Sequence, residues 1–353
     1  MPAPEPTAAA SSSSSRATVS ESAVTEPSVT EPTVTEPTVT ELGLPDRVPL
    51  AGLPAAVRIH EVGPRDGLQN EQSSLPVAVK AEFITRLAAA GLRTIEATSF
   101  VHPKWVPQLA DAEQLFPLVA ALPERHPGLR LPVLVPNERG LERALAHHVG
   151  DIAVFASATE SFAQRNLNRS VAESLEMFAP VVRRATAEGI PVRGYLSMCF
   201  GDPWEGPVAP ARVAEVGRRL LDLGCAELSL GDTIGTGTPG QVVALLAEFA
   251  AQGVGPERLA VHFHDTYGQA LANTLAALQC GVTVVDASAG GLGGCPYAKS
   301  ATGNLATEDL VWMLHGLGIE TGVDLNALAA TSVWVAEQLG RPSPSRAVRA
   351  LAS

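Results

Sequence analysis

The sequence predicts an α/β protein in which strands alternate with helices around a closed parallel sheet. Three observations lead to this prediction. Short apolar runs alternate with helix-length segments from Val57 onward. There are eight such runs, which is the number of strands in a (β/α)8 TIM barrel. No GxGxxG motif follows the first run, and this disfavours the second-best fold, an open doubly wound sheet.

The predicted strands are rich in Val, Leu, Ile and Ala, and segments with helical spacing lie between them. The strands are expected at residues 57–62, 94–99, 130–135, 151–157, 192–197, 226–232, 259–265 and 284–289. The clearest intervening helices are 77–91, 170–189 and 239–253, each ending in Gly, a common helix stop. One more helix is predicted at 324–340, in an additional C-terminal segment that we expect on the outside or at the mouth of the barrel.

Residues 1–45 are predicted to form a disordered acidic tail, and the barrel domain is expected to span 50–345. Within the tail, residues 22–41 repeat a Val-Thr-Glu-Pro-Thr/Ser unit. Proline at every fifth position prevents a helix, and the repeat has no apolar face to bury. The first residues have neither the basic and apolar segments of a secretory signal nor the Arg-rich composition of a transit peptide.

Charge and cysteine content exclude several classes of function. The formal net charge is −12, whereas nucleic-acid binding needs a basic face. An anionic small molecule can still bind to a few local basic groups. No run of 18 apolar residues is present, so no membrane span is expected. The four cysteines form no CxxC pair, which argues against a disulfide framework or a zinc–thiolate site and fits a reducing cytoplasm.

Polar residues follow most of the predicted strands, at the end where such a barrel carries its active site. His262 and His264 lie two residues apart on the seventh strand, so their side chains point to one side and Phe263 points to the other. Such histidines can also be hydrogen-bonded core residues. Because the pair lies at the carboxyl end of a barrel strand, we favour two imidazoles that share a metal ion.

Two further residues complete a candidate metal site. Asp66 follows the first strand and offers a carboxylate, and Asn304 follows the eighth and offers an amide oxygen. The first, seventh and eighth strands are close neighbours in a closed barrel. A set of nitrogen and oxygen ligands without thiolate suits Mg²⁺ or Mn²⁺ better than zinc.

Three charged residues at the same end are candidates for supporting roles. Arg65 directly precedes Asp66. It could form a structural ion pair, but its place at a strand end favours stabilisation of developing oxyanion charge. Glu96 and Asp232 are acids that we expect to face inward. Each could orient Arg65 or a histidine, or serve the structure alone.

Six segments of the chain carry distinctive motifs. They are EVGPRDGLQNE (61–71), TSFVHPKWVPQLAD (98–111), RGYLSMCFGDPWEG (193–206), SLGDTIGTGTPG (229–240), HFHDTYGQALANTLAAL (262–278) and GGLGGCPYAKSATGNLATED (290–309). Together they resemble the hydroxymethylglutaryl-CoA lyase family, within a larger group of metal-dependent TIM-barrel lyases and Claisen synthases. The resemblance covers about 57–340, and the first and last motifs are the most specific.

The resemblance implies a carbon–carbon lyase that cleaves 3-hydroxy-3-methylglutaryl-CoA to acetoacetate and acetyl-CoA with the help of Mg²⁺ or Mn²⁺. It also suggests a homodimer and a place in leucine breakdown in the cytoplasm. Matching by motif position, the metal ligands would be Asp66, His262, His264 and Asn304. In the same way, Arg65 would stabilise the enolate and Cys295 would take part in proton transfer, while Glu96, Asp232 and Glu308 would support the site.

Some points remain open at this stage. Either Asp66 or His262 could be the base that takes the hydroxyl proton. The substrate could be a longer 3-hydroxy-3-alkylglutaryl-CoA. A Claisen synthase that condenses acetyl-CoA with a 2-oxo acid is a further alternative, although the Gly-Cys-Pro-Tyr loop at 294–297 favours the lyase. A metallohydrolase is disfavoured because its HxH motif usually lies on the first strand.

Residues 290–309 are predicted to form a catalytic lid followed by a helix. The glycines between 290 and 294 would act as a hinge, with Cys295 on the moving part and Asn304 fixed at the metal. Thr307 is predicted to be the N-cap of the following helix, with Glu308 and Asp309 in its first turn.

Overall fold

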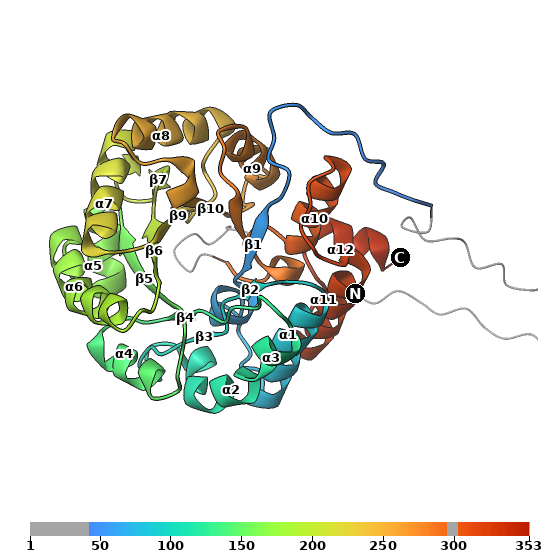
Figure 1. Cartoon of the computed structure of the whole chain (residues 1–353), viewed down its shortest axis with the longest axis horizontal. Coiled ribbons are helices and arrows are strands. Elements are labelled where there is room, and N and C mark those ends of the chain that lie inside the picture. The colour runs from blue at the N-terminus through green and yellow to red at the C-terminus, as the bar shows by residue number, and fades with distance from the viewer. Residues whose placement is uncertain (1–41, 295–302, 353) are drawn as a thin grey trace, which may run out of the picture. The chain divides into compact units, whose positions relative to one another are not determined.

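The computed structural model describes residues 42–294 and 303–352 (Figure 1). Nine parallel strands form its main sheet, in the order β2-β1-β11-β10-β9-β6-β5-β4-β3. The strands are β1 (Arg58–Glu61), β2 (Thr94–Ile95), β3 (Thr98–Ser99), β4 (Val133–Leu134), β5 (Ile152–Ser157), β6 (Val192–Ser197), β9 (Glu227–Asp232), β10 (Leu259–Phe263) and β11 (Val284–Ala287). Each lies within one of the eight predicted strand segments.

The sheet closes because the predicted strand 94–99 is divided between two neighbours. Its first half, β2, pairs with β1, and its second half, β3, pairs with β4. Between the halves, the amide of Glu96 donates to the carbonyl of Glu61 (2.8 Å), whereas the amide of Ala97 donates to the carbonyl of Pro132 (2.9 Å). The two halves therefore join the ends of the sheet, and the predicted eight-stranded barrel is confirmed.

Helices surround the strands in Figure 1. Ser170 begins α6 with a reciprocal capping box to Glu173, and Gly224 ends α7 in the left-handed conformation. The ring consists of α1 (Val77–Ala89), α2 (Ala112–Val119), α3 (Leu122–Arg125), α4 (Glu138–Leu145), α5 (Glu160–Leu167), α6 (Val171–Ala187), α7 (Pro210–Leu223), α8 (Pro239–Ala251), α9 (Ala270–Gln279) and α10 (Thr307–Gly316). A small antiparallel pair, β7 (Gly201–Asp202) and β8 (Gly206–Pro207), follows β6.

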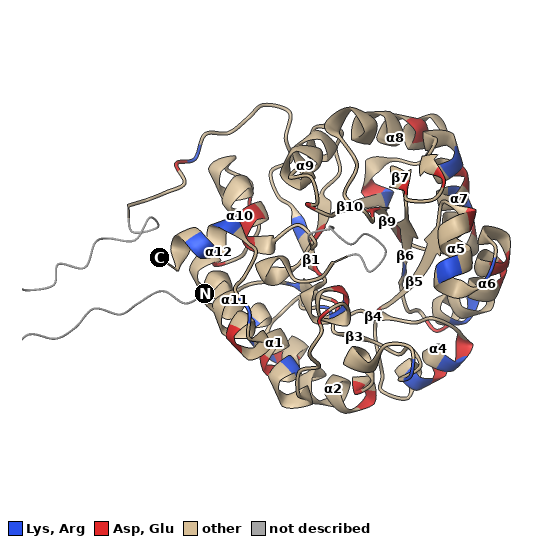
Figure 2. Ribbon diagram, turned by 180° about the vertical axis from the view of Figure 1, so that it is seen from behind, with Lys and Arg blue, Asp and Glu red and all other residues tan. Residues whose placement is uncertain are grey.

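The helices bury their apolar faces on the sheet and leave most of their charged residues outside. In Figure 2, Lys, Arg, Asp and Glu are spread over the outer ring, and a smaller group lies inside it on the strands. The buried core is dominated by Val, Leu, Ile, Phe and Ala from both layers. Charged side chains inside such a core need partners, so the inner group is where a functional site is expected. No helix in the described residues is long and apolar enough to cross a membrane.

Two helices follow the barrel. The predicted C-terminal helix is α11 (Leu325–Leu339), which packs on the outside against α1 and α10. A second one, α12 (Arg346–Leu351), was not predicted. Its start is fixed by Asp309 of α10, whose carboxylate accepts from Ser345 Oγ (2.6 Å) and from the amide of Ala347 (2.8 Å). The tail at 1–45 lies almost wholly outside the described residues and, like the domain bounds 50–345, stays a prediction.

Candidate active site

The turn after β1 carries Arg65 and Asp66, and a buried acid shapes it. The chain enters a π-helical turn at Gly63–Gly67. The Glu61 carboxylate accepts from the amide of Gly63 (2.8 Å), and a Cβ at Gly63 would lie 2.6 Å from Glu61 Oε1. Glu61 also accepts from the amide of Ala289 (2.9 Å) and from Thr307 Oγ1 (2.7 Å). The turn is thereby tied to the segment after β11 and to the start of α10.

The prediction that Thr307 caps α10 is wrong. The helix begins at Thr307, its N-cap is Ala306, and the Thr307 hydroxyl donates to Glu61 instead. Glu308 and Asp309 do lie in the first turn, as predicted. The Thr307 hydroxyl is therefore the third donor to the buried Glu61 carboxylate and does not cap α10.

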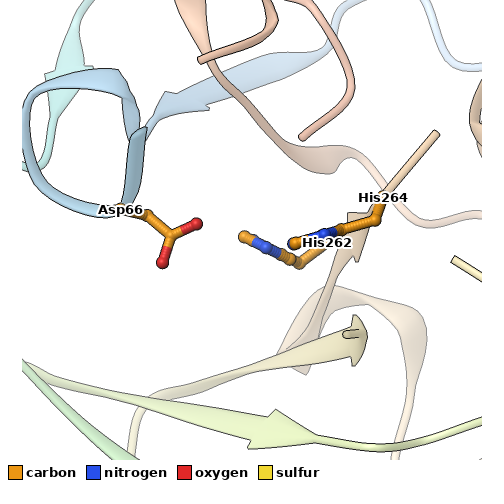
Figure 3. A group of neighbouring side chains, drawn as sticks. All are labelled: Asp66, His262 and His264. Carbon is orange, nitrogen blue, oxygen red and sulfur yellow. The ribbon is translucent and has the colours of Figure 1, made fainter. Parts of the chain in front are cut away.

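Asp66 and the two histidines of the HxH motif form one cluster. His262 lies in β10 and His264 just beyond it, and both side chains point toward Asp66 (Figure 3). One ligand atom from each of the three residues lies within 4.8 Å of the others. Phe263 points away and packs on Phe200, with ring centroids 6.0 Å apart. The alternation along β10 thus separates the site from the core.

Asn304 joins this cluster from the segment after the glycine-rich loop. Its backbone lies beside His264, and its Nδ2 donates to Asp66 Oδ2 (2.9 Å) and to the carbonyl of Leu292 (3.1 Å). These two acceptors fix the amide orientation. Asn304 Oδ1 is left buried, with no hydrogen-bond partner within residues 42–294 and 303–352.

The arrangement fits a divalent metal ion. Like Asn304 Oδ1, His264 Nδ1 is buried without a partner in the described part of the chain. His262 Nδ1 lies 3.1 Å from Asp286 Oδ2, so its Nε2 remains free to bind a metal. A carboxylate, two imidazole nitrogens and an amide oxygen are a ligand set that Mg²⁺ and Mn²⁺ accept.

For Asp66 and His264 the electrostatics favour the protonation states that a metal ion needs, whereas at His262 the opposing effect of burial is outweighed by Asp286, which raises the pKa. Burial opposes ionisation of Asp66, but Arg65 and the two histidines outweigh it and lower the pKa to about 2. Burial, reinforced by His262, lowers the pKa of His264 to about 4. At neutral pH, Asp66 is therefore a carboxylate and His264 a neutral imidazole.

Arg65 is held beside the cluster by two acids. Its Nη1 donates to Asp66 Oδ1 (2.6 Å) and its Nη2 to Glu96 Oε2 (3.0 Å). The guanidinium also lies 5.2 Å from the ring centroid of Tyr195, and the Tyr195 hydroxyl donates to the same Glu96 oxygen (2.6 Å). These contacts agree with the prediction that Glu96 orients Arg65, one of the two roles that the sequence left open for it.

Asp232 and Glu308 bond mainly to backbone. Asp232 accepts from the amides of Thr236 (3.0 Å) and Gly237 (2.8 Å), and burial raises its pKa to about 6. Glu308 accepts from the amide of Gly290 (2.9 Å) and from Ser332 Oγ. These bonds shape the loop after β9 and the start of the glycine run. Cys295 lies outside the described residues.

Sequence analysis did not select several residues inside the barrel. Asp286 of β11 contacts His262, and Arg193 of β6 donates to Asp286 through Nη2 (2.5 Å). His60 of β1 lies 2.6 Å from Arg193, from its Nδ1 to Nη1. The sequence does carry one sign of such residues, which is a charged residue inside an otherwise apolar strand, as in VVDASA and VRGYLS.

A cavity of about 720 Å³ opens at the cluster. Arg65, Asp66 and both histidines line one part of it. Other parts of its lining include Trp105, Asn166 and two exposed arginines, Arg165 and Arg169. The reactive groups therefore share one space with polar and basic side chains that lie nearer to solvent.

Comparison with known proteins identifies what the chain resembles. The HMGL-like family model matches residues 56–335. A mitochondrial hydroxymethylglutaryl-CoA lyase from Arabidopsis thaliana is 54% identical over 85% of this chain, which spans 63% of that protein's length. The mitochondrial enzyme from Mus musculus is 53% identical over 84% of this chain and 90% of its own. A cytoplasmic 3-hydroxy-3-methylglutaryl-CoA lyase from Rattus norvegicus is 50% identical over 85% of this chain and 86% of its own.

Solved structures agree with this similarity. Hydroxymethylglutaryl-CoA lyase from Pseudomonas aeruginosa is 50% identical, with a TM-score of 0.82 over 85% of this chain and 99% of that one. An HMG-CoA lyase from Acinetobacter baumannii, in complex with coenzyme A and 3-methylmalate, is 34% identical with a TM-score of 0.78 over 86% and 96% of the two chains. The carboxyl transferase domain of Rhizobium etli pyruvate carboxylase, at 19% identity and a TM-score of 0.59 over 81% and 48%, shares the fold alone.

Proposed function

The chain belongs to the HMGL-like family, and from this premise we propose that it cleaves 3-hydroxy-3-methylglutaryl-CoA to acetoacetate and acetyl-CoA. The observation that carries the proposal is the cluster of Asp66, His262 and His264, with Arg65 beside it, on the lining of a cavity. Relatives at about half identity over most of their length are named for this reaction. A carbon–carbon lyase is therefore the activity that both site and family support.

We propose that Asp66, His262, His264 and Asn304 hold the ion, and that it is Mg²⁺ or Mn²⁺. The unpaired Asn304 Oδ1 and His264 Nδ1 support this ligand set. A bound ion of this kind would act as a Lewis acid that orients the substrate and lowers the pKa of its 3-hydroxyl group. Zinc is less favoured because the set adds an amide oxygen to a carboxylate, and such oxygen ligands suit Mg²⁺ and Mn²⁺ better.

Arg65 is proposed to stabilise the thioester enolate that leaves when the carbon–carbon bond breaks. Its guanidinium is fixed by Asp66 and Glu96 before substrate binds. A donor that is already in place needs no reorganisation as negative charge develops, which makes it an effective stabiliser of the transition state. Glu96 and Tyr195 contribute by holding Arg65 in this position.

Two proton transfers complete the reaction. The 3-hydroxyl proton leaves as the carbon–carbon bond breaks, and the base is Asp66, or His262 if its Nε2 is released from the ion. The electron pair of the broken bond forms the enolate, whose carbon then takes a proton to give acetyl-CoA. We propose Cys295 as that donor, because a thiol with its ordinary pKa of about 8.5 can give and regain a proton near neutral pH.

The acyl-CoA substrate is proposed to enter through the cavity at the site. Arg165 and Arg169 are exposed on its lining and can attract an anionic molecule. The related Acinetobacter baumannii structure contains coenzyme A. A longer 3-hydroxy-3-alkylglutaryl-CoA remains the second candidate substrate, since the cavity of about 720 Å³ has room beyond the reactive groups.

We also propose that the protein works as a homodimer in the cytoplasm. Relatives carry both mitochondrial and cytoplasmic names. The four cysteines without a CxxC pair favour a reducing compartment. Light scattering of the purified chain would test the dimer, and a monomer at micromolar concentration would contradict it.

The decisive experiment measures acetoacetate release from 3-hydroxy-3-methylglutaryl-CoA. Activity is expected to disappear with EDTA and to return with Mg²⁺ or Mn²⁺. A panel of longer 3-hydroxy-3-alkylglutaryl-CoA thioesters would define the substrate. Full activity after complete chelation would rule out the metal. Condensation of acetyl-CoA with a 2-oxo acid, with hydroxymethylglutaryl-CoA left intact, would instead identify a synthase.

A further inference from the structure

A buried group of polar side chains lies behind His262, inside the barrel. Asp286 of β11 is at its centre and is only 2% exposed. Its Oδ1 accepts from Arg193 Nη2 (2.5 Å), and its Oδ2 accepts from Ser229 Oγ (2.7 Å). The same Oδ2 lies 3.1 Å from His262 Nδ1. One carboxylate thus receives an arginine, a hydroxyl and an imidazole, which come from three different strands.

This contact determines which nitrogen of His262 carries a proton. A carboxylate that is paired with an arginine can only accept hydrogen bonds. His262 Nδ1 must then be a protonated nitrogen, and in the neutral ring Nε2 carries the lone pair. Because Nδ1 is tethered to Asp286, Nε2 is the nitrogen left for the cluster with Asp66 and His264.

We propose that Asp286, braced by Arg193 and Ser229, is a positioning residue that holds His262 in the Nδ1–H tautomer with Nε2 directed at the metal ion. The inference rests on the proposed function in so far as that function uses the ion. Carboxylates that accept from a metal-binding histidine in this way raise its basicity and fix its ring.

The bracing of Asp286 extends further into the barrel. Arg193 Nη1 lies 2.6 Å from His60 Nδ1 and 2.9 Å from Glu227 Oε1, so the guanidinium is held from three sides. Arg193 is itself buried, at 6% exposed. A fixed guanidinium keeps Asp286 ionised and keeps Oδ1 turned away from His262. Asp286 Oδ2 is then available to accept a hydrogen bond from His262 Nδ1.

The two histidines of the HxH motif are therefore not equivalent. His262 has a carboxylate behind it, whereas His264 Nδ1 is buried with no partner among the residues that the structure describes. Only His262 has its tautomer set by the protein. Loss of the carboxylate should affect His262 and leave His264 as it is.

The substitution Asp286→Asn tests this with little change in shape. Arg193 can only donate, so the Asn carbonyl oxygen should stay where Oδ1 is. The Asn amide nitrogen then replaces Oδ2 and presents a donor to His262 Nδ1. His262 is thereby driven to the Nε2–H tautomer, which has no lone pair directed at the ion. A matched control is Asp309→Asn, since Asp309 is also buried but caps α12.

Two measurements on the full chain give the outcome. Imidazole ¹⁵N chemical shifts of His262 should show Nδ1–H in the wild type and Nε2–H in Asp286→Asn. Dissociation constants for Mn²⁺, measured by electron paramagnetic resonance of the free ion, should rise by about 10- to 100-fold in Asp286→Asn. Asp309→Asn should bind Mn²⁺ like the wild type. Near-wild-type Mn²⁺ binding by a folded Asp286→Asn protein would overturn the proposal.

The wild-type spectrum tests the idea even if Asp286→Asn fails to fold, because an Nε2–H tautomer there would refute it directly. A wild-type protein that binds no Mn²⁺ would overturn the metal centre and this inference together. If Asp286→Asn weakens Mn²⁺ binding but the wild type does not cleave hydroxymethylglutaryl-CoA, the positioning role stands and the proposed substrate fails.

Discussion

Replacing Glu308 with Gln should make the free energy of unfolding of the protein less sensitive to rising pH. Glu308 is fully buried beneath the glycine run, where it accepts from the amide of Gly290 and from Ser332 Oγ. Burial raises its pKa from 4.5 to about 8, and the nearby Glu61 adds to the rise. Gln has nearly the shape of the protonated acid and cannot ionise, so the substitution isolates the effect of the proton.

The sign of the effect follows from where the proton is bound. Below pH 4.5 Glu308 is protonated in both the folded and the unfolded chain. Between pH 4.5 and about 8 the unfolded chain loses this proton while the folded chain keeps it, so the free energy of unfolding falls as pH rises. Each pKa unit corresponds to about 1.4 kcal/mol, so the full rise corresponds to roughly 5 kcal/mol.

Urea unfolding of the wild type and Glu308→Gln between pH 5 and 9 would measure this. The variant should gain stability relative to the wild type as pH increases, by a few kcal/mol at pH 8. Glu61, whose pKa is raised to about 7 by burial, should leave a smaller slope in the variant. Glu176→Gln, on an exposed part of α6, serves as the control. Parallel pH curves for wild type and Glu308→Gln would refute the reasoning.

Three further predictions concern the same end of the barrel. Cys295→Ala should lower kcat by about 10²- to 10⁴-fold, the usual effect of losing an acid–base group. Its unfolding by urea should be unchanged. Normal turnover by this variant would contradict a role of Cys295 in proton transfer. Thr307→Val should cost about 1–3 kcal/mol of unfolding free energy, because a buried acceptor loses its donor. Gly293→Ala should weaken Mn²⁺ binding about tenfold or more, since its Cβ would lie 2.7 Å from Asn304 Nδ2, whereas Gly128→Ala, also at positive φ but with open space around it, should not.

The barrel could be predicted because its pattern is local. Each strand is an apolar run, and the intervening helices have their own spacing and stops. The division of strand 94–99 could not be predicted in this way. It depends on the amides of Glu96 and Ala97 finding acceptors on opposite sides, which only the closed sheet provides. Helix α12 has a local N-cap in Ser345, but its first turn is also stabilised by Asp309, which is distant in the sequence and could not be predicted.

The candidate site could be predicted where metal-binding residue types occur at a spacing that places them on one side of a strand. The alternation of His262, Phe263 and His264 places two imidazoles on one side, and the turn after β1 brings Asp66 to them. Asp286 could not be found by the same reasoning. It is one acid inside an apolar strand, and its importance comes from its contacts with His262 and Arg193, whose strands lie elsewhere in the sequence.

Six of the acids toward this end of the barrel fall into two groups according to their hydrogen-bond partners. Glu61, Asp232 and Glu308 accept mainly from backbone amides and hydroxyls, and burial raises the pKa of each. Asp66, Glu96 and Asp286 face arginine or histidine, and the pKa of each is lowered. The first group shapes the turns after the strands. The second group stays charged at neutral pH and can therefore hold a metal ion or a cationic side chain in place. The sequence alone does not separate these six acids, and the nature of the hydrogen-bond donor is what distinguishes them.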